Sequence, residues 1–373
     1  ATFIEYVYDF QGLGVFVVSN DSVNFVRIEA EPSWVDWIVS LAFGKNGTND
    51  VNLEKTLGQL YNNFISPIKH LLPPRGSKVI ICPTGPLSIM PLSSALDENG
   101  DPLFMSFCVG ISPSIKALAV LNENRHPNQF GNILAIAYAG DERSKHYLPF
   151  AETEAYLVSS LFNNSTIISG KGTNAEQILS KMSEYDVVHF ASHGHLSGDM
   201  PESSGLVLAD GKWLTISDIV NRMAFKKSPI IVLNACNIGH EHLQENDEHL
   251  GIPRAFLFAG ASSVVANMWP VDDFPSALFM KRFHEELHKI QRETGSVFPA
   301  EALRNSQNWI RSLSKDELLL FLEDLFGDLV GNNMLDGARV VRYQIAHLRP
   351  RSEYYPYSDP YYWAGYLVIG LMN

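Results

Sequence analysis

The chain has 373 residues, of which 46% are hydrophobic and 18% charged, and its formal net charge is −13 at pH 7. This composition is typical of a globular protein with a substantial core and excludes an intrinsically disordered chain. The acidic balance argues against nucleic acid as a direct ligand. A solvated acidic surface is the simpler interpretation of this charge, and attraction of basic partners or basic substrate segments is the alternative.

The three cysteines, Cys82, Cys108 and Cys236, do not make a disulfide framework in a chain of this length. No apolar run reaches the roughly 18–20 residues that a membrane helix requires, and no signal peptide opens the chain. We therefore expect a reducing, cytoplasmic location and no membrane partner. Because the sequence starts at Ala1 rather than Met, it can be a domain cut from a longer protein.

The first part of the chain is rich in strands. Short apolar runs separated by turn residues predict an antiparallel meander over 3–28, and apolar residues at helical spacing predict a helix over 53–71. The polar stretch 122–131 is the best candidate boundary in the chain. We expect one domain over 1–130 and a second over 131–373.

The second part alternates strands with helices. Short runs rich in Val, Ile and Leu, separated by helical patterns, predict a parallel sheet that is covered on both faces. The predicted strands lie at 132–139, 165–170, 186–192, 229–235 and 262–269. Residues 315–330 predict an amphipathic helix with an acidic face, for packing or, alternatively, for docking a partner.

Reactive side chains follow two of the predicted strands. The strand at 186–192 runs into His193 and Gly194, and the strand at 229–235 runs into Cys236. One helical crossover separates the two strands, so they can be neighbours about 4.8 Å apart, with their carboxyl ends at the same edge of the sheet. A thiol needs a nearby base to become a nucleophile, and histidine supplies one.

The backbone around this pair suits acyl transfer. A glycine at position 194 lets the main chain approach a substrate carbonyl and donate its N–H to the oxyanion, with the N–H of Cys236 as second donor. His189 is expected to be a structural residue in mid-strand, and His195 competes with His193 for the role of base.

Simpler interpretations of the same residues remain open at this point. A lone cysteine at a strand end is usually a small buried hydrophobic residue, and a lone histidine usually a structural hydrogen-bonding group. His240, His242 and His249 lack the spacing of a zinc site. Neither a P-loop nor a dinucleotide fingerprint is present, so we expect no metal and no cofactor.

Several motifs resemble a known family. HFASHG (189–194) and LNACNIG (233–239) resemble the two catalytic motifs of CHAT domains, caspase-like peptidases often fused to tetratricopeptide repeats. Four further segments, at 79–96, 148–162, 254–273 and 360–370, are similar to other parts of the family, so that the resemblance runs from about residue 50 to the end.

The resemblance implies a caspase-like α/β fold, in which a mostly parallel sheet is flanked by helices. It implies that 131–373 is the catalytic subdomain and that 1–130 is a related, catalytically empty pseudo-caspase subdomain. It places the base on His193 and the nucleophile on Cys236, as in a cysteine endopeptidase that cleaves a protein partner.

The resemblance also bears on specificity. In the related separases, acidic residues after a segment similar to 269–273 take part in binding an arginine at P1. Asp272 is therefore our first candidate for the S1 pocket and Asp273 the second, with Trp269 as a wall. The alternative is that both aspartates only cap the helix that begins near Phe274.

Asn234 stands two residues before Cys236, where some arginine-specific relatives have an acid. This difference weakens the case for a deep acidic pocket. Asp141 and Glu142, after the first strand of the second part, are candidates to supply the missing charge.

Two other functions remain open from the sequence. One is a non-catalytic interaction or scaffold domain with the same fold, and the other is acyl transfer to a small molecule by the same dyad. For a peptidase, we expect control by a regulatory repeat domain or activator protein outside this chain, acting on 239–250 or 315–330.

Overall fold

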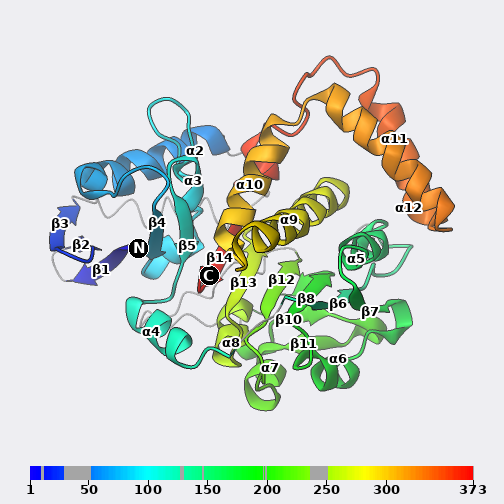
Figure 1. Ribbon diagram of the computed structural model, residues 1–373, viewed down its shortest axis with the longest axis horizontal. Coiled ribbons are helices and arrows are strands. Elements are labelled where there is room, and N and C mark those ends of the chain that lie inside the picture. Colours follow the sequence, from blue (N-terminus) through cyan, green and yellow to red (C-terminus); the bar gives the residue numbers. More distant parts are fainter. Residues whose placement is uncertain are drawn as a thin grey trace.

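The computed structural model describes residues 1–9, 12–28, 52–126, 130–144, 147–195, 197, 200–235 and 251–372. Within these ranges, eleven strands form one sheet that runs through the molecule (Figure 1). In sheet order the strands are β3 (Val23–Ile28), β2 (Gly12–Val18), β1 (Thr2–Asp9), β4 (Lys78–Cys82), β5 (Cys108–Ile111), β14 (Tyr366–Gly370), β13 (Ser263–Asn267), β12 (Ile230–Asn234), β8 (Val187–Ala191), β6 (Asn132–Ala137) and β7 (Asn164–Ser169).

Most neighbouring strands of the sheet are parallel. Within the eleven described strands of this sheet, the antiparallel pairs are β1 with β2, β2 with β3, and β13 with β14. The predicted antiparallel meander over 3–28 and the predicted parallel arrangement of the second part are therefore confirmed. Every residue of β8, β12 and β13 is buried, as expected for strands that are covered on both faces.

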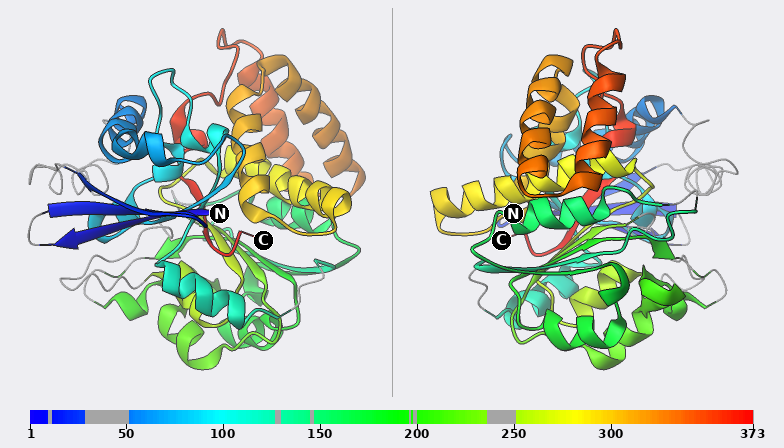
Figure 2. Two further views of the ribbon diagram at one scale, coloured as in Figure 1. Left: turned by 60° about the vertical axis from the view of Figure 1, so that its left-hand side comes forward. Right: turned by 90° about the vertical axis from the view of Figure 1, so that its right-hand side faces the viewer.

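Helices cover both faces of the sheet (Figure 2). One face carries α4 (Ile115–Glu123), α6 (Ala175–Met182), α7 (Ile216–Arg222) and α8 (Ile252–Phe258). The other carries α2 (Leu53–Leu60), α3 (Leu103–Ser106), α5 (Ala151–Ser159), α9 (Asp273–Thr294) and α10 (Pro299–Ser312). The protein is thus mixed α/β, with a large, mostly parallel sheet flanked by helices, as predicted.

Polar side chains fix where several helices begin. Asn174 caps α6 by accepting a hydrogen bond from the Gln177 N–H. Thr215 and Asp218 form a reciprocal capping box at the start of α7. The helix predicted over 53–71 is also confirmed, because α2 continues through η2 (Tyr61–Ile65) and η3 (Ser66–Leu71).

The remaining regular elements are short. A second sheet, in the order β11-β10-β9, follows β8 along the chain and consists of β9 (Gly194–His195), β10 (Gly205–Val207) and β11 (Trp213–Thr215). Single 3₁₀ turns occur at η4 (Gly85–Ile89), η5 (Leu92–Ser94), η6 (Gly170–Gly172), η7 (Pro201–Ser203), η8 (Ala209–Gly211) and η9 (Pro360–Tyr362).

The last strand joins the two parts of the chain. β14 pairs with β5 on one side and with β13 on the other, so one sheet passes through both 1–130 and 131–373. Ser94 also donates a side-chain hydrogen bond to the carbonyl of Ala364 just before β14. The hydrophobic core is correspondingly shared between the two parts.

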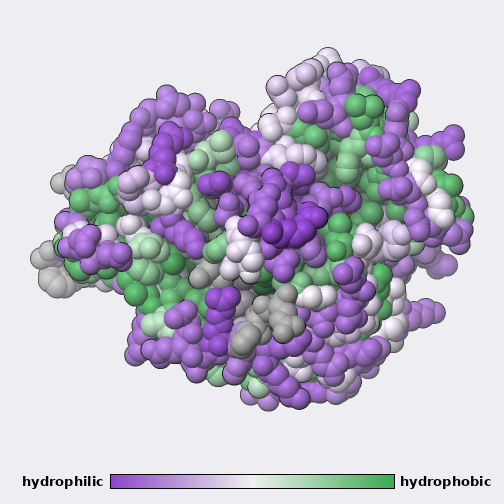
Figure 3. All heavy atoms as spheres, viewed as in Figure 1, coloured by the Kyte–Doolittle hydropathy of each residue, from purple (hydrophilic) through white to green (hydrophobic). Residues whose placement is uncertain are grey.

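A helical hairpin of α11 (Lys315–Gly331) and α12 (Leu335–Leu348) projects from the α9 and α10 side of the sheet (Figure 1). The helix predicted over 315–330 is confirmed, and its buried leucines pack against α12. Leu320, on the outer side, is 66% exposed. Figure 3 shows hydrophobic patches in the region of this hairpin on an otherwise mostly hydrophilic face.

None of the helices in the described ranges is both long enough and apolar enough to cross a membrane.

Candidate active site

The site is built at the carboxyl ends of three adjacent parallel strands, β6, β8 and β12. Ala191, the last residue of β8, pairs with Asn234, the last residue of β12. The N–H of Ser192 then donates to the carbonyl of Asn234, with a distance of 3.3 Å between N and O. His193 and Cys236 each follow two residues after this matched pair. The prediction that the two strands are neighbours is confirmed, while Cys236 itself lies outside the described residues.

Local hydrogen bonds hold the main chain around His193. The carbonyl of His193 accepts a hydrogen bond of 2.8 Å from the N–H of Val207, which lies at the end of β10. The hydroxyl of Ser192 donates to the carbonyl of the same Val207, at 2.5 Å. These bonds tie the exit of β8 to the small sheet and fix the direction in which the chain leaves the strand.

The imidazole of His193 lies over Gly140, three residues after the end of β6. Gly140 has a φ of +86°, and a Cβ built on it would lie 3.4 Å from Nε2 of His193. A side chain at this position would therefore be strained by the backbone, and its Cβ would already be in van der Waals contact with the ring. The sequence analysis did not single out this glycine, although Gly140 immediately precedes the candidate residue Asp141.

The structure separates the other histidines of the motif from His193. His195 is stacked on Trp213, with 3.8 Å between ring centroids and 23° between the planes. His189 is fully buried, and its Nε2 lies 2.8 Å from a carboxylate oxygen of Glu154. The structural role expected for His189 agrees with this contact. Gly194 belongs to β9, where it pairs with Leu206, and its role as oxyanion donor stays a prediction.

A buried carboxylate lies beneath the strand ends. Glu154, on α5, is 1% exposed, and both of its carboxylate oxygens accept hydrogen bonds from Nδ2 of Asn234, at 2.9 and 2.8 Å. The same Nδ2 lies 3.2 Å from the hydroxyl of Ser276 on α9. The sequence analysis missed Glu154. Its signal was an acid on the otherwise apolar face of the helix that Ala151, Ala155 and Val158 form.

A small cavity of about 20 Å³ lies between these groups and the start of α9. Its wall is formed on the strand side by Ser192, Asn234 and Ala235, and on the helix side by Glu154 and Asp273. Asn267 also lines it, and the Oδ1 atom of Asn267 has no hydrogen-bond partner among the described residues. The cavity is therefore rich in hydrogen-bond acceptors.

Among the titratable groups that line this cavity, Asp273 has the most strongly shifted pKa. Burial raises its pKa to about 7, and the negative charges of Glu154 and Asp272 act in the same direction. The N–H of Phe150, at the start of α5, donates to Oδ2 of Asp273 at 2.7 Å and opposes the rise. The carboxyl group of Asp273 thus caps α5 from a neighbouring helix.

The structure places the other specificity candidates away from this cavity. Asp272 is exposed and lines an open cleft of about 990 Å³ with tyrosines of 355–362, and its side chain makes no capping hydrogen bond to α9. Trp269 is buried, and its indole N–H donates to the carbonyl of Tyr361 at 2.9 Å. Asp141 is exposed and accepts a hydrogen bond from the N–H of Arg143.

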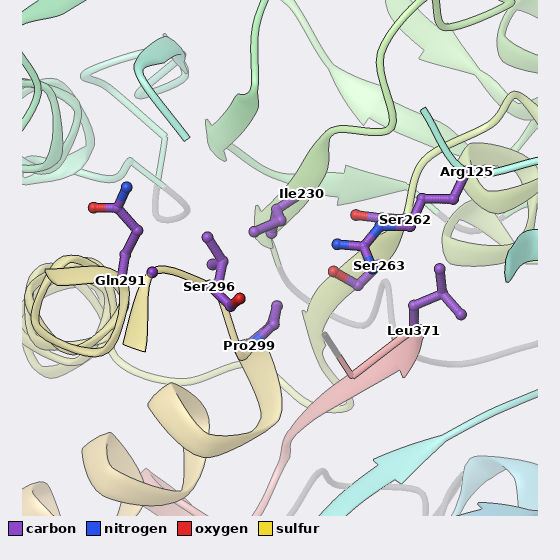
Figure 4. A pocket seen from close by; sticks show the side chains of 10 residues that line it. Arg125, Ile230, Ser262, Ser263, Gln291, Ser296, Pro299 and Leu371 are labelled. Atoms are coloured by element: carbon purple, nitrogen blue, oxygen red, sulfur yellow. The ribbon is translucent and has the colours of Figure 1, made fainter. Parts of the chain in front are cut away.

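Another pocket, of about 280 Å³, lies at the opposite edge of the sheet (Figure 4). Ile230 and Ser263, which line it, are the first residues of β12 and β13, and Leu371 follows the end of the antiparallel β14. The side chain of Arg125 points toward Ser262 and Ser263 in this pocket (Figure 4). Its position at the amino ends of the strands separates it from His193.

Among the residues that the structure describes, no three His, Cys, Asp or Glu side chains are grouped as a metal site would require. His240, His242 and His249, which the sequence analysis considered for such a site, lie outside the described residues.

Known proteins resemble the chain at several levels. Tetratricopeptide repeat protein 28 from Homo sapiens is 24% identical over 289 residues, which cover 62% of this chain and 11% of that protein. The Mus musculus protein of the same name is 24% identical over 209 residues, covering 43% of this chain and 8% of that protein. The chain thus matches about a tenth of the length of these relatives.

Two solved structures are similar at low sequence identity. The separase of a Saccharomyces cerevisiae separase–securin complex has a TM-score of 0.48 and 14% identity, covering 79% of this chain and 16% of that chain. The Arg-specific cysteine proteinase gingipain R has a TM-score of 0.42 and 11% identity, covering 91% and 73%. The model of the CHAT domain family matches residues 54–371, and the chain therefore belongs to the CHAT domain family.

Proposed function

We propose that the chain is a cysteine endopeptidase in which His193 and Cys236 form the catalytic dyad. The observation that carries the proposal is the register of β8 and β12. Their last residues are paired, and the two candidate residues follow at the same distance along the chain on each side. Consecutive Cα atoms are about 3.8 Å apart, so Cys236, directly after Ala235, starts next to the described strand end.

In the proposed reaction, the imidazole of His193 takes the proton of the Cys236 thiol, and the thiolate sulfur attacks the carbonyl carbon of the scissile peptide. The N–H groups of Gly194 and Cys236 donate to the resulting oxyanion. The imidazolium then gives its proton to the leaving amine, and a thioester remains. Water, deprotonated by His193, hydrolyses the thioester and restores the thiol.

The cavity beside the strand ends supports a preference for a basic side chain at P1. Carboxylate oxygens of Glu154 and Asp273 line it, together with the unpartnered Oδ1 of Asn267. A guanidinium or ammonium group would supply donors to Oδ1 of Asn267 and to the carboxylate of Asp273, whereas both oxygens of Glu154 already accept from Asn234. We assign the negative charge of the S1 pocket to Asp273 in preference to Asp272. Asp273 lines the cavity together with Asn234 and Ala235, whereas Asp272 lines the open cleft with the tyrosines.

In the form described, the cavity holds about one water molecule, since its volume is about 20 Å³. An arginine side chain therefore requires the cavity to widen when substrate binds. The arriving cation would also stabilise the carboxylate of Asp273 and so lower its raised pKa.

We further propose that activity is controlled by a repeat region or an activator protein outside this chain. The proposal is supported by the small share of the tetratricopeptide repeat relatives that the chain matches. The segment 239–250, which the sequence analysis considered for this control, lies outside the described residues. On the described surface, the exposed side of α11 is the candidate contact. Replacing Leu320 with Glu should then abolish activation by the longer protein without changing the basal rate.

The test of the peptidase proposal is cleavage of a peptide library made from a whole proteome, with the new ends read by mass spectrometry. Wild type should cleave after Arg and Lys, and Cys236→Ala and His193→Ala should each lower kcat/KM by at least about 1,000-fold. Asp273→Asn should lose the preference for basic P1 residues, while Asp272→Asn, its matched control, should keep it. Cleavage that survives Cys236→Ala contradicts the dyad, and the absence of any wild-type cleavage contradicts the peptidase.

A further inference from the structure

The carboxylate of Glu154 joins the two strands that carry the proposed dyad. It accepts from His189 of β8, four residues before His193, and from Asn234 of β12, two residues before Cys236. Side chains at alternate positions of a strand point to the same face. The contacts of His189 and Asn234 with α5 and α9 therefore lie on the face toward which His193 and Cys236 would project if the alternation continued.

The charge of this network can be assigned from its hydrogen bonds. Nδ1 of His189 lies 3.3 Å from Nε2 of His284 on α9, and Nδ1 of His284 has no partner among the described residues. Burial lowers the pKa of His284 well below its usual value, so this ring is neutral. A buried N–H without an acceptor costs more free energy than a buried nitrogen lone pair without a donor. The proton of His284 is therefore on Nε2, which donates it to Nδ1 of His189.

It follows that His189 donates its own Nε2 proton to Glu154. The described network then consists of one carboxylate that accepts from Nδ2 of Asn234 and from Nε2 of His189. The titratable groups that face Glu154 are His189 from β8 and, beyond it, His284 from α9, together with Asp273 at the start of α9. None of them is a lysine or an arginine.

We propose, resting on the dyad proposed above, that Glu154 is a positioning residue that fixes the separation of His193 and Cys236 by holding the ends of β8 and β12 to α5. Both carboxylate oxygens of Glu154 accept hydrogen bonds from Asn234, and one of them also lies within hydrogen-bond distance of His189. The effect of Glu154 passes through the side chains of His189 and Asn234, and then along two to four residues of main chain.

The geometry makes the carboxylate hard to replace. Glutamine at position 154 has the same shape, but its amide nitrogen is a donor and would meet either the Asn234 amide or the His189 N–H, which are also donors. One buried donor would lose its partner unless the amide of Asn234 turned over, which would take its Nδ2 away from the hydroxyl of Ser276; either change disturbs the end of β12. Misplacement by about 1 Å is sufficient to cost about 100-fold in rate.

An exchange of the two groups tests this specifically. In the double variant Glu154→Gln/Asn234→Asp, the amide of residue 154 donates to the new carboxylate at 234, while its carbonyl oxygen still accepts from His189. We expect Glu154→Gln to lower kcat/KM by about 10- to 100-fold, with most of the loss in kcat, and the double variant to return to within about threefold of wild type.

The same comparison can be made without any peptide substrate, by measuring how fast iodoacetamide alkylates Cys236. The other two cysteines do not interfere, because both are buried, with pKa values raised by burial to about 12 for Cys82 and about 11 for Cys108. If His193 is displaced, the thiol of Cys236 loses its base. Glu154→Gln should therefore slow alkylation near neutral pH by about tenfold, and the double variant should restore it.

Two controls separate positioning from general loss of stability. Glu152→Gln makes the same chemical change on the exposed side of the same helix and should change neither rate. Ile4→Val removes a methyl group from a fully buried site in β1, away from the candidate site, and should lower the melting temperature without changing alkylation of Cys236. Asn234→Ala serves as a second disrupting variant should Glu154→Gln fold poorly.

The inference is overturned if Glu154→Gln and Asn234→Ala fold and both react at the wild-type rate. It is also overturned if the exchange of groups restores stability but not the rate of alkylation. An absence of wild-type peptide cleavage would remove the peptidase proposal alone, since alkylation of Cys236 would still decide the role of Glu154.

Discussion

The imidazole of His193 lies against the backbone of Gly140. The φ of +86° at this glycine strains any residue that has a Cβ, and an added Cβ would already touch Nε2 of His193 at 3.4 Å, so a side chain that extends beyond Cβ has little room. Gly140→Val should lower stability by about 1–2 kcal/mol through the left-handed backbone and lower kcat/KM by about tenfold, because its two γ-carbons extend beyond a Cβ that already contacts the ring. Chemical denaturation and peptide hydrolysis measure the two effects.

Gly100 provides the matched control for this substitution. Its φ of +78° is similar, but an added Cβ would meet no atom within 4 Å. Gly100→Val should therefore lower stability by a similar amount and leave the activity of the folded protein unchanged. Equal activity in both variants would show that the ring of His193 does not depend on Gly140.

Asp273 should make the folded protein less stable as the pH rises, which is the opposite of the usual effect of a carboxyl group. Its pKa is raised by burial from 3.8 to about 7 in the folded protein, so between these values the folded state binds a proton that the unfolded state does not. The contribution of Asp273 to the free energy of unfolding is complete below about pH 4 and is lost as the pH rises toward 7.

Asp273→Asn should accordingly flatten the pH dependence of stability. The difference in free energy of unfolding between wild type and variant, measured with urea from about pH 4.5 to about pH 7.5, should shift steadily in favour of the variant as the pH rises. A constant difference across this range would mean that Asp273 titrates at its usual value.

Site residues could be predicted from the sequence where their location depends only on the strand that they follow. His193 and Cys236 each follow a buried strand in the sequence, and the sheet pairs the last residues of those two strands. The sequence does not distinguish Asp272 from Asp273, because the direction of each side chain depends on how the start of α9 meets the start of α5. Glu154 was missed for a related reason, since its partners come from β8 and β12.

At the level of elements, the helix boundaries depend on local capping groups. Ser314 accepts a hydrogen bond from the N–H of Glu317, and the carboxylate of Glu317 accepts one from the N–H of Ser314. Ser314→Ala should therefore lower the free energy of unfolding by about 1 kcal/mol, measured by denaturant titration. Ser312→Ala, two residues earlier at an exposed position of α10, should change it by less than about 0.5 kcal/mol.

The strands and helices of the second part were predictable because each buried strand is a short apolar run and each helix has its own period and cap. The sequence did not reveal that the last strand enters the middle of the sheet. β14 pairs with residues about 100 and about 260 positions earlier, and local patterns carry no information on such partners.

At the level of the whole molecule, β14 makes the two parts of the chain interdependent. It is hydrogen-bonded to β5 on one side and β13 on the other, and Tyr366 stacks on Phe279 of α9 with 3.9 Å between ring centroids. We therefore expect 1–130 and 131–373 to unfold together. Calorimetry should give one transition, with equal calorimetric and van't Hoff enthalpies.

Two resolved transitions would instead mean that the two parts are separate folding units in contact. A variant that weakens β14 helps to distinguish the two cases. Tyr366→Ala should lower a single shared transition, whereas in separate units it would lower only the transition of the part that contains α9 and β13.

The dyad is tested most directly by covalent labelling with a peptidyl-arginine chloromethyl ketone, followed by mass spectrometry of the modified residue. The account predicts one label per chain, on Cys236, with a rate at least about 100-fold lower in His193→Ala and a marked loss of rate in Asp273→Asn. Labelling of Cys236 at the same rate in wild type and His193→Ala, or labelling of a different residue, would contradict it.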